Sequence, residues 1–298
     1  MAEDIVLLQE ARNALQYLQS TSTRMARTAG RLITGLKVAS PADDPVAYYQ
    51  AQALSDRATD FINRKSEIDQ GVSSVQTAIV GTDASVKILK QMKGLVSSAR
   101  TADASTRASL TAQYNELSRQ HNGMVGDASY QGLNLLSGST TNLTVYFGEG
   151  TGAALAINAQ NLNASALFTA AGPASGGTLS TLLSGGGLAT DASGFSVLSE
   201  SSSAAAVLDT LSAQIDRSIS TVRATAARLG GNVTTLQTRL DFTTAYVGTL
   251  QDGAAKLTLA DVTEEAANML ALQTSYQIGM AMLGIAGRDR RAVLSLFR

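Results

Sequence analysis

Side chains capable of acid–base chemistry are few in this sequence. His121 is the only histidine among 298 residues, and a histidine is the usual proton carrier of a catalytic triad. Because His121 falls on a stripe of apolar residues at helical spacing, we predict a packed structural histidine. The chain has no cysteine, so thiolate nucleophiles and thiolate metal ligands are excluded.

Two pairs of adjacent carboxylates, Asp43–Asp44 and Glu264–Glu265, have the chemistry of a general acid and base. Both pairs stand where a helical pattern starts, and negative charge is favoured there by the helix dipole, so we predict capping. The stretch "GEGTG" (148–152) resembles a phosphate loop but lacks the Lys-Ser/Thr that must follow. We therefore expect a hairpin turn, no catalytic residue, no metal, no cofactor and no enzyme activity.

The composition excludes several classes of partner. A net charge of −1 and a pI near 5.9 leave no basic surface for nucleic acid or anionic lipid. The first residues, "MAEDIVLLQEARNALQ", are acidic where a secretory signal is basic, so we expect no cleaved signal peptide. No stretch approaches the ~20 apolar residues of a membrane span, and we expect no membrane insertion.

Hydrophobic periodicity predicts long helices. Apolar residues recur at steps of three and four from Leu8 to Leu36, again from Ala47 to Val96, and again over about 105–128. The second stripe predicts a helix roughly 75 to 80 Å long, which is too long for the interior of a compact domain. After an interruption, two further stripes run from Ile215 to Leu257 and from Val262 to Phe297.

The breaks between these helices carry recognisable signals. A glycine ends the first helix, two prolines interrupt the chain, and an aspartate followed by proline starts the second helix. A second aspartate, with Glu264 three residues later, forms a capping-box pattern that restarts the last helix in a new register. We predict that these positions act as hinges for the terminal helices: Gly35, Pro41, Asp44, Pro45 and Asp261.

The middle of the chain differs in kind. Residues 142–158 alternate around a Gly-rich turn, which predicts a β-hairpin, and the Gly- and Ser-rich residues that follow predict loop rather than core. The predicted fold is mainly α: a long antiparallel coiled-coil or helical-bundle rod, with both termini at one end and a small β-hairpin insertion. The predicted segments are a coiled coil of the two terminal helices (1–36 and 258–298), a rod (37–138 and 204–257) and an insertion (139–203).

The terminal helices carry more apolar surface than they can cover between themselves. The last helix also has apolar residues off its stripe: Leu270, Leu272, Ile278, Met282, Ile285, Val293 and Leu296. Such a helix is too hydrophobic to remain exposed, which favours burial against other copies. We predict a self-assembly stripe made of Leu8, Leu15, Leu18, Met25 and Leu32 in the first helix and of Met269, Tyr276, Met280, Leu283, Leu294 and Phe297 in the last.

Four segments carry a resemblance to a known family: "GRLITGLKVASPADDPVAYYQAQALSDR" (30–57), "IDQGVSSVQTA" (68–78), "DASYQGLNLL" (127–136) and "AVLSLFR" (292–298). Together they resemble bacterial flagellins, and the short insertion is similar to that of alphaproteobacterial flagellins. The resemblance implies secretion through the flagellar export apparatus with a chaperone, and polymerisation into the extracellular filament that drives swimming. It also implies contacts with hook-associated and cap proteins.

One departure from the family concerns recognition by an animal innate immune receptor. The segment "LKQMKGLVSSAR" (89–100) corresponds to the receptor-binding motif of flagellins. Gln91, Gly94 and Ser97 stand where that motif usually has Arg, Glu and Val, so we predict weak recognition.

Two alternatives remain open from the sequence. "ASPADDPVA" also resembles the hook–filament junction protein of the same machine, although "VLSLFR" and "SYQGLNLL" favour flagellin. A surface adhesin that uses the insertion is the second alternative.

Overall fold

The computed structural model describes residues 2–138, 142–148, 150, 152–169, 183–184, 187–188 and 204–296. The chain divides into two compact units. The first unit comprises Met1–Thr59 and Val247–Arg298, and the second comprises Asp60–Tyr246. No helix in these described ranges is long and apolar enough to cross a membrane.

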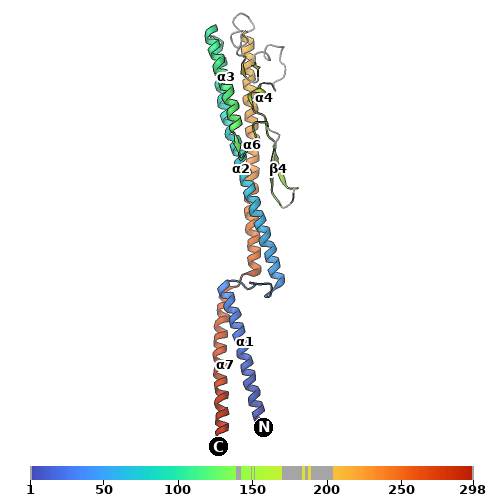
Figure 1. Cartoon of the computed structure of the whole chain (residues 1–298), viewed down its shortest axis with the longest axis vertical. Coiled ribbons are helices and arrows are strands. Elements are labelled where there is room, and N and C mark those ends of the chain that lie inside the picture. Colours follow the sequence, from blue (N-terminus) through green and yellow to red (C-terminus); the bar gives the residue numbers. More distant parts are fainter. Residues whose placement is uncertain are drawn as a thin grey trace. The chain divides into compact units, whose positions relative to one another are not determined.

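The first unit is built on α1 (Ala2–Thr34) and α7 (Val262–Leu296), which lie side by side (Figure 1). The start of α2 (Pro45–Ala99) and the end of α6 (Ala204–Thr258) also belong to this unit. The segment that leaves α1 pairs with the segment that enters α7, through an antiparallel bridge between Leu36 and Leu259. The two terminal helices are therefore antiparallel, and both chain ends lie at the end of the pair remote from this bridge.

The helix boundaries of this unit follow the predicted signals. Gly35 adopts a φ of 69°, the left-handed conformation that glycine tolerates, and its N–H donates to the Arg31 carbonyl at 2.8 Å. The carboxylate of Asp44 accepts from the N–H groups of Val46 and Ala47, both at 3.0 Å, and so caps α2. Asp261 caps α7 in the same way, accepting from two N–H groups of its first turn at 2.9 and 3.2 Å. The predicted capping by these two aspartates is confirmed.

Two residues of the predicted carboxylate pairs, Asp43 and Glu265, make contacts beyond the helix starts. Asp43 closes the turn before α2, accepting from the backbone N–H groups of Ala39 and Ser40. Glu265 is buried and forms an ion pair with Arg31 on the opposite helix. Glu264 and Glu265 both lie in the first turn of α7, where the helix dipole favours negative charge as predicted. The sequence did not reveal the further contacts, the turn closed by Asp43 and the ion pair of Glu265.

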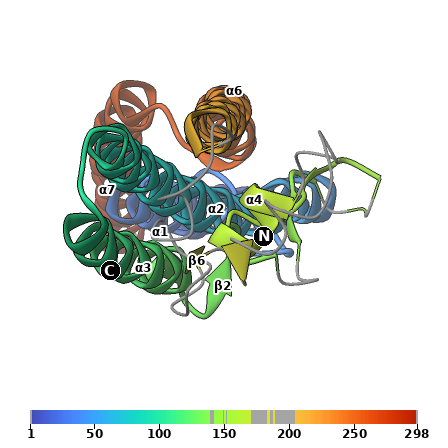
Figure 2. The same cartoon turned by 90° about the horizontal axis from the view of Figure 1, so that it is seen from above.

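In the second unit, α2, α3 (Ala104–Asp127) and α6 run alongside one another, as both views show (Figures 1 and 2). Three separate antiparallel hairpins accompany them: β1 (Ser129–Tyr130) with β2 (Leu133–Asn134), β3 (Leu143–Tyr146) with β4 (Ala154–Ile157), and β5 (Leu183–Ser184) with β6 (Gly187–Leu188). The β3–β4 hairpin, in the register Leu143 to Ile157, confirms the predicted hairpin. In the tighter β1–β2 hairpin, Gln131 and Gly132 occupy the turn with φ of 49° and 81°.

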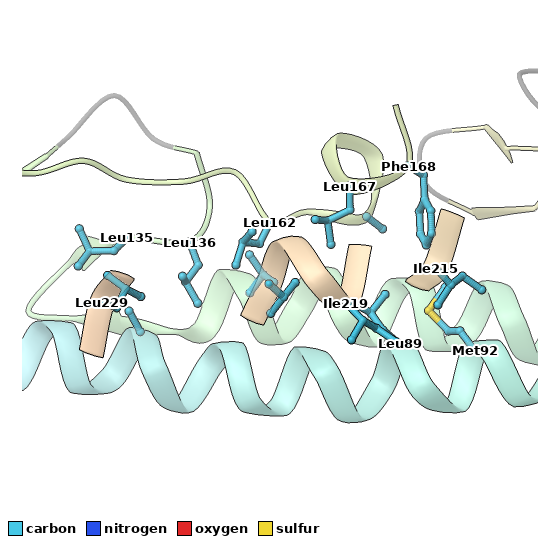
Figure 3. Close-up of a cluster of buried hydrophobic side chains, with 14 of the residues drawn as sticks. Leu89, Met92, Leu135, Leu136, Leu162, Leu167, Phe168, Ile215, Ile219 and Leu229 are labelled. Carbon is cyan, nitrogen blue, oxygen red and sulfur yellow. The ribbon is translucent and has the colours of Figure 1, made fainter. Parts of the chain in front are cut away.

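The hydrophobic core of the second unit includes part of the predicted insertion. Leu162 and the short helix α4 (Ala164–Thr169) pack against α2 and α6, and Leu167 and Phe168 are buried there (Figure 3). The Gly- and Ser-rich stretches predicted as loop come later in the chain, beginning at residue 172, and lie largely outside the described residues. A run of six helical residues is too short to display a period, so only its packing partners identify it as core.

Candidate functional site

The surface between α1 and α7 is made largely of small and polar side chains. Among the described side chains of α1, the buried ones are Leu18, Thr21 and Thr28; those of α7 are Glu265 and Gly279. A Cβ added to Gly279 would lie 2.9 Å from a terminal methyl carbon of Leu18, so Gly279 is where α7 packs closely against the Leu18 side chain of α1. The hydroxyl of Thr21 donates to the Tyr17 carbonyl at 2.8 Å, which satisfies a buried polar group.

One ion pair crosses this surface near the joint between the helices. A guanidinium nitrogen of Arg31 donates to Oε1 of Glu265 at 2.8 Å. The Glu265 side chain is 10% exposed and that of Arg31 is 35% exposed, so the contact is largely shielded from water. A charged pair of this kind tolerates few alternative alignments, because sliding α1 along α7 leaves a buried carboxylate without its partner.

The linkers that flank the pair are held to each other. The N–H of Lys37 donates to the Thr258 carbonyl at 2.8 Å, and the N–H of Ala260 donates to the Gly35 carbonyl at 2.9 Å. The pKa of Asp43 is lowered chiefly by the hydroxyl of Ser40, and further by the N–H groups of Ser40 and Ala39. Of the predicted hinge residues, Gly35 takes part directly in this pairing of the two linkers.

A cavity of about 460 Å³ opens beside these linkers. Its lining is mostly charged, with Arg31 and Lys37 facing several carboxylates, among them Asp43 and Asp261. Within the described part of the chain, no three histidine, aspartate or glutamate side chains are grouped so that they could hold a metal ion. The carboxylates that line the cavity have structural roles. Asp44 and Asp261 cap helices, Asp43 closes a turn, and Glu265 pairs with Arg31.

The predicted self-assembly residues fall into three groups. Leu18 is buried, Leu15 and Met280 are exposed, and the half-buried residues are Met25, Leu32, Met269, Tyr276 and Leu283. The side chains of Leu8 and Leu294, and the whole of Phe297, lie outside the described residues. Steps of three and four from Leu8 pass through Ser22 and Ala29. The structure instead buries their neighbours Thr21 and Thr28, so the buried face of α1 is turned by about one residue from the predicted stripe.

A second apolar surface on α7 has no partner in the single chain among the described residues. Four large exposed side chains are spaced by eight, four and three residues, which places them on one side of the helix. We call this surface the outer face of α7; it consists of Leu270, Ile278, Met282 and Ile285. On α1, Tyr17 and Ile33 are likewise exposed.

Other residues singled out from the sequence lie in the second unit. His121 is fully buried, and burial lowers its pKa to about 4, so it carries no charge at neutral pH. Gln91, Gly94 and Ser97 are all exposed on α2, and their spacing of three residues places them on one surface.

Family models match both ends of the chain. The model of the bacterial flagellin N-terminal helical region matches residues 5–141, and that of the bacterial flagellin C-terminal helical region matches residues 207–297. Flagellin FljO of Caulobacter vibrioides is 28% identical over 287 residues, covering 96% of this chain and 95% of that protein. A flagellin of Brucella melitensis is 25% identical over 290 residues, covering 97% of this chain and 96% of that protein.

A solved structure has a similar fold. It is a Vibrio parahaemolyticus protein described as flagellar hook-associated, with a TM-score of 0.57, 14% identity, and coverage of 73% of this chain and 100% of that chain. At this identity the likeness concerns the fold alone and does not favour the hook–filament junction alternative. The matches to flagellins of Caulobacter and Brucella confirm the resemblance noted in the sequence. With both family models matched in order, the chain belongs to the bacterial flagellins, the structural subunits of the flagellar filament.

Proposed function

We propose that this flagellin enters the filament through α1 and α7, whose exposed apolar side chains become covered by neighbouring copies. One contrast between the two units supports the proposal. Large apolar side chains of α2, α3 and α6 form a continuous buried core in the second unit. In the first unit, by contrast, Ile33 remains 85% exposed and Leu270 remains 68% exposed.

The energetics of the terminal pair point the same way. Apolar burial stabilises a fold by about 25 cal/mol per Å². Among the described side chains of α1 and α7, Leu18 is the one large apolar group that is buried, and the other buried positions are threonines, a glycine and the glutamate of the ion pair. Two helices joined by so little apolar contact are marginal in water. We therefore propose that the terminal helices reach their full order only on joining the growing end of the filament.

Family membership supports further partners as part of the same proposal. A filament subunit must leave the cell, so we propose secretion through the flagellar export apparatus, assisted by a chaperone, and a final location in the extracellular filament. Hook-associated and cap proteins would contact the ends of that filament. The role proposed for the chain is structural and involves no catalysis.

Truncation tests the mechanism. Removal of residues 1–36 or 262–298 is expected to abolish elongation of filament seeds, measured by sedimentation and electron microscopy. Circular dichroism should show that the helices of the second unit persist, since its core lies within residues 68–236. Filaments of normal length formed by either truncated protein would contradict the proposal.

A full-length variant gives a sharper test on the outer face of α7. Ile278→Asp places a charge on this face while removing no buried contact of the single chain, because Ile278 is exposed. Asn268→Asp is the matched control: it adds the same charge at an exposed polar position of the same helix. Elongation should fall at least tenfold for the first variant and stay near wild type for the second; equal rates would contradict the proposal.

A further inference from the structure

The sulfur chemistry of this chain rests entirely on methionine. The sequence has seven methionines and no cysteine, so a thioether is the group that a mild two-electron oxidant attacks first. Exposure determines which thioether is attacked. Met92 is fully buried in the second unit. Met280 is 50% exposed and Met282 is 63% exposed. The half-buried methionines are Met25, Met124 and Met269.

The two exposed methionines lie on the helix that is proposed to make contacts between copies. Met282 stands between Ile278 and Ile285 on the outer face of α7, four residues after the first and three before the second. Met280 is also exposed, but because it stands two residues from Met282 it lies about 200° away around the helix, outside the outer face. Methionine suits such a surface, because its unbranched side chain adapts to the shape of an apolar partner.

We infer that oxidation of Met282 on the outer face, together with the exposed Met280 of the same helix, controls whether a free subunit can join the filament. With hydrogen peroxide as oxidant, the thioether sulfur attacks one peroxide oxygen. The O–O bond breaks, an S–O bond forms, the sulfur loses two electrons, and water is released. The product is methionine sulfoxide, which methionine sulfoxide reductases convert back to methionine.

The sulfoxide changes the surface in a way that opposes assembly. Its oxygen is a strong hydrogen-bond acceptor, and the neighbouring side chains of the outer face, Ile278 and Ile285, offer no donor. Covering that oxygen with another copy would bury an unsatisfied polar group. An assembled subunit, in contrast, has this face covered and should resist the oxidant, so the sensitivity belongs to the free subunit.

This inference rests on the proposed function, since it requires that the outer face of α7 be covered during assembly. Free full-length protein is treated with hydrogen peroxide, and tandem mass spectrometry of the 257–288 peptide locates the added oxygen. Met280 and Met282 should be modified before Met269 in the same peptide, and long before Met92. Elongation of seeds by the oxidised protein should slow at least tenfold, and treatment with methionine sulfoxide reductase should restore it.

Variants identify the responsible residues. Met280→Leu/Met282→Leu keeps apolar side chains of similar volume and should elongate at the unoxidised rate after peroxide treatment. Met124→Leu, in the second unit, is the matched control and should remain as sensitive as wild type. The inference is overturned if the oxidised wild type elongates normally, if the double variant is inhibited equally, or if reductase treatment restores nothing.

The Ile278→Asp variant, used without oxidant, separates the two proposals. If it fails to elongate while oxidised wild type elongates normally, the oxidation inference is wrong and the assembly surface stands. If it elongates as well as Asn268→Asp, the proposed assembly surface is itself wrong, and the oxidation inference falls with it.

Discussion

The guanidinium of Arg31 donates to the carboxylate of Glu265 across a distance of 2.8 Å, although 234 positions separate the two residues in the chain. This contact ties the end of α1 to the beginning of α7, next to the paired linkers of the first unit. It is a charged contact on a surface otherwise poor in large apolar groups. The alignment of the terminal helices therefore depends on it more than it would in a well-filled core.

Reversal of the Arg31–Glu265 pair tests this alignment. Arg31→Glu should weaken the α1–α7 contact by about 1–3 kcal/mol, because it leaves Glu265 shielded from water beside a like charge. Arg31→Glu/Glu265→Arg should recover most of the loss. Hydrogen exchange of the α7 amides and elongation of seeds measure the effect. A double variant no better than the single one would show that the pair does not set the alignment.

Two glycines of α2 make a matched test of close packing. A Cβ on Gly81 would lie 2.8 Å from the Cβ of Ala128, which cannot rotate away, whereas a Cβ on Gly94 meets nothing within 4 Å. Gly81→Ala should lower the free energy of unfolding by about 1–3 kcal/mol, and Gly94→Ala should raise it by up to about 1 kcal/mol. Thermal unfolding followed by circular dichroism measures both, and equal effects would contradict the packing argument.

The pH dependence of the stability of the second unit should reveal the protonation of His121. Burial lowers the pKa of its imidazole to about 4, below the usual 6.5, so the unfolded chain binds a proton that the folded chain does not between these values. Stability should therefore fall as pH drops from about 6.5 to about 4, by on the order of 3 kcal/mol.

A histidine-free variant isolates this effect from that of the carboxylates. His121→Leu removes the titrating group and places an apolar side chain at the same buried position. Urea unfolding at a series of pH values should give a flatter curve for the variant between pH 6.5 and 4. If the curves of the two proteins run parallel over this range, the contribution assigned to His121 is wrong.

Recognition by the animal flagellin receptor is expected to be weak. Gln91, Gly94 and Ser97 are exposed on one surface of α2, so each is available to a receptor, but they lack the usual Arg, Glu and Val. We propose that Gln91→Arg/Gly94→Glu/Ser97→Val raises the signal in a reporter-cell assay at least tenfold. A potent response to the unmodified protein would contradict the expectation.

Local sequence determined most of the elements. Asp44 and Asp261 cap their helices, and Gly35 ends α1, because these signals act within a few residues through backbone hydrogen bonds and backbone conformation. The long helices were also predictable, because apolar residues that recur every three or four positions over many turns fit an α-helix and no other element. The motifs near both ends of the chain identified the bacterial flagellins, and the two flagellin family models match the chain.

Packing decided the rest. Whether Leu167 belongs to loop or core depends on α2 and α6 around it, and no period in six residues carries that information. The buried face of α1 passes through Thr21 rather than Ser22, and Glu265, in the first turn of α7, also pairs with Arg31, because the approach of the opposite helix selects the side chains that lose water. Periodicity shows that a helix has an apolar side. Only the packing partner determines which side chains are covered and which, like Ile278 and Met282, remain exposed in the single chain.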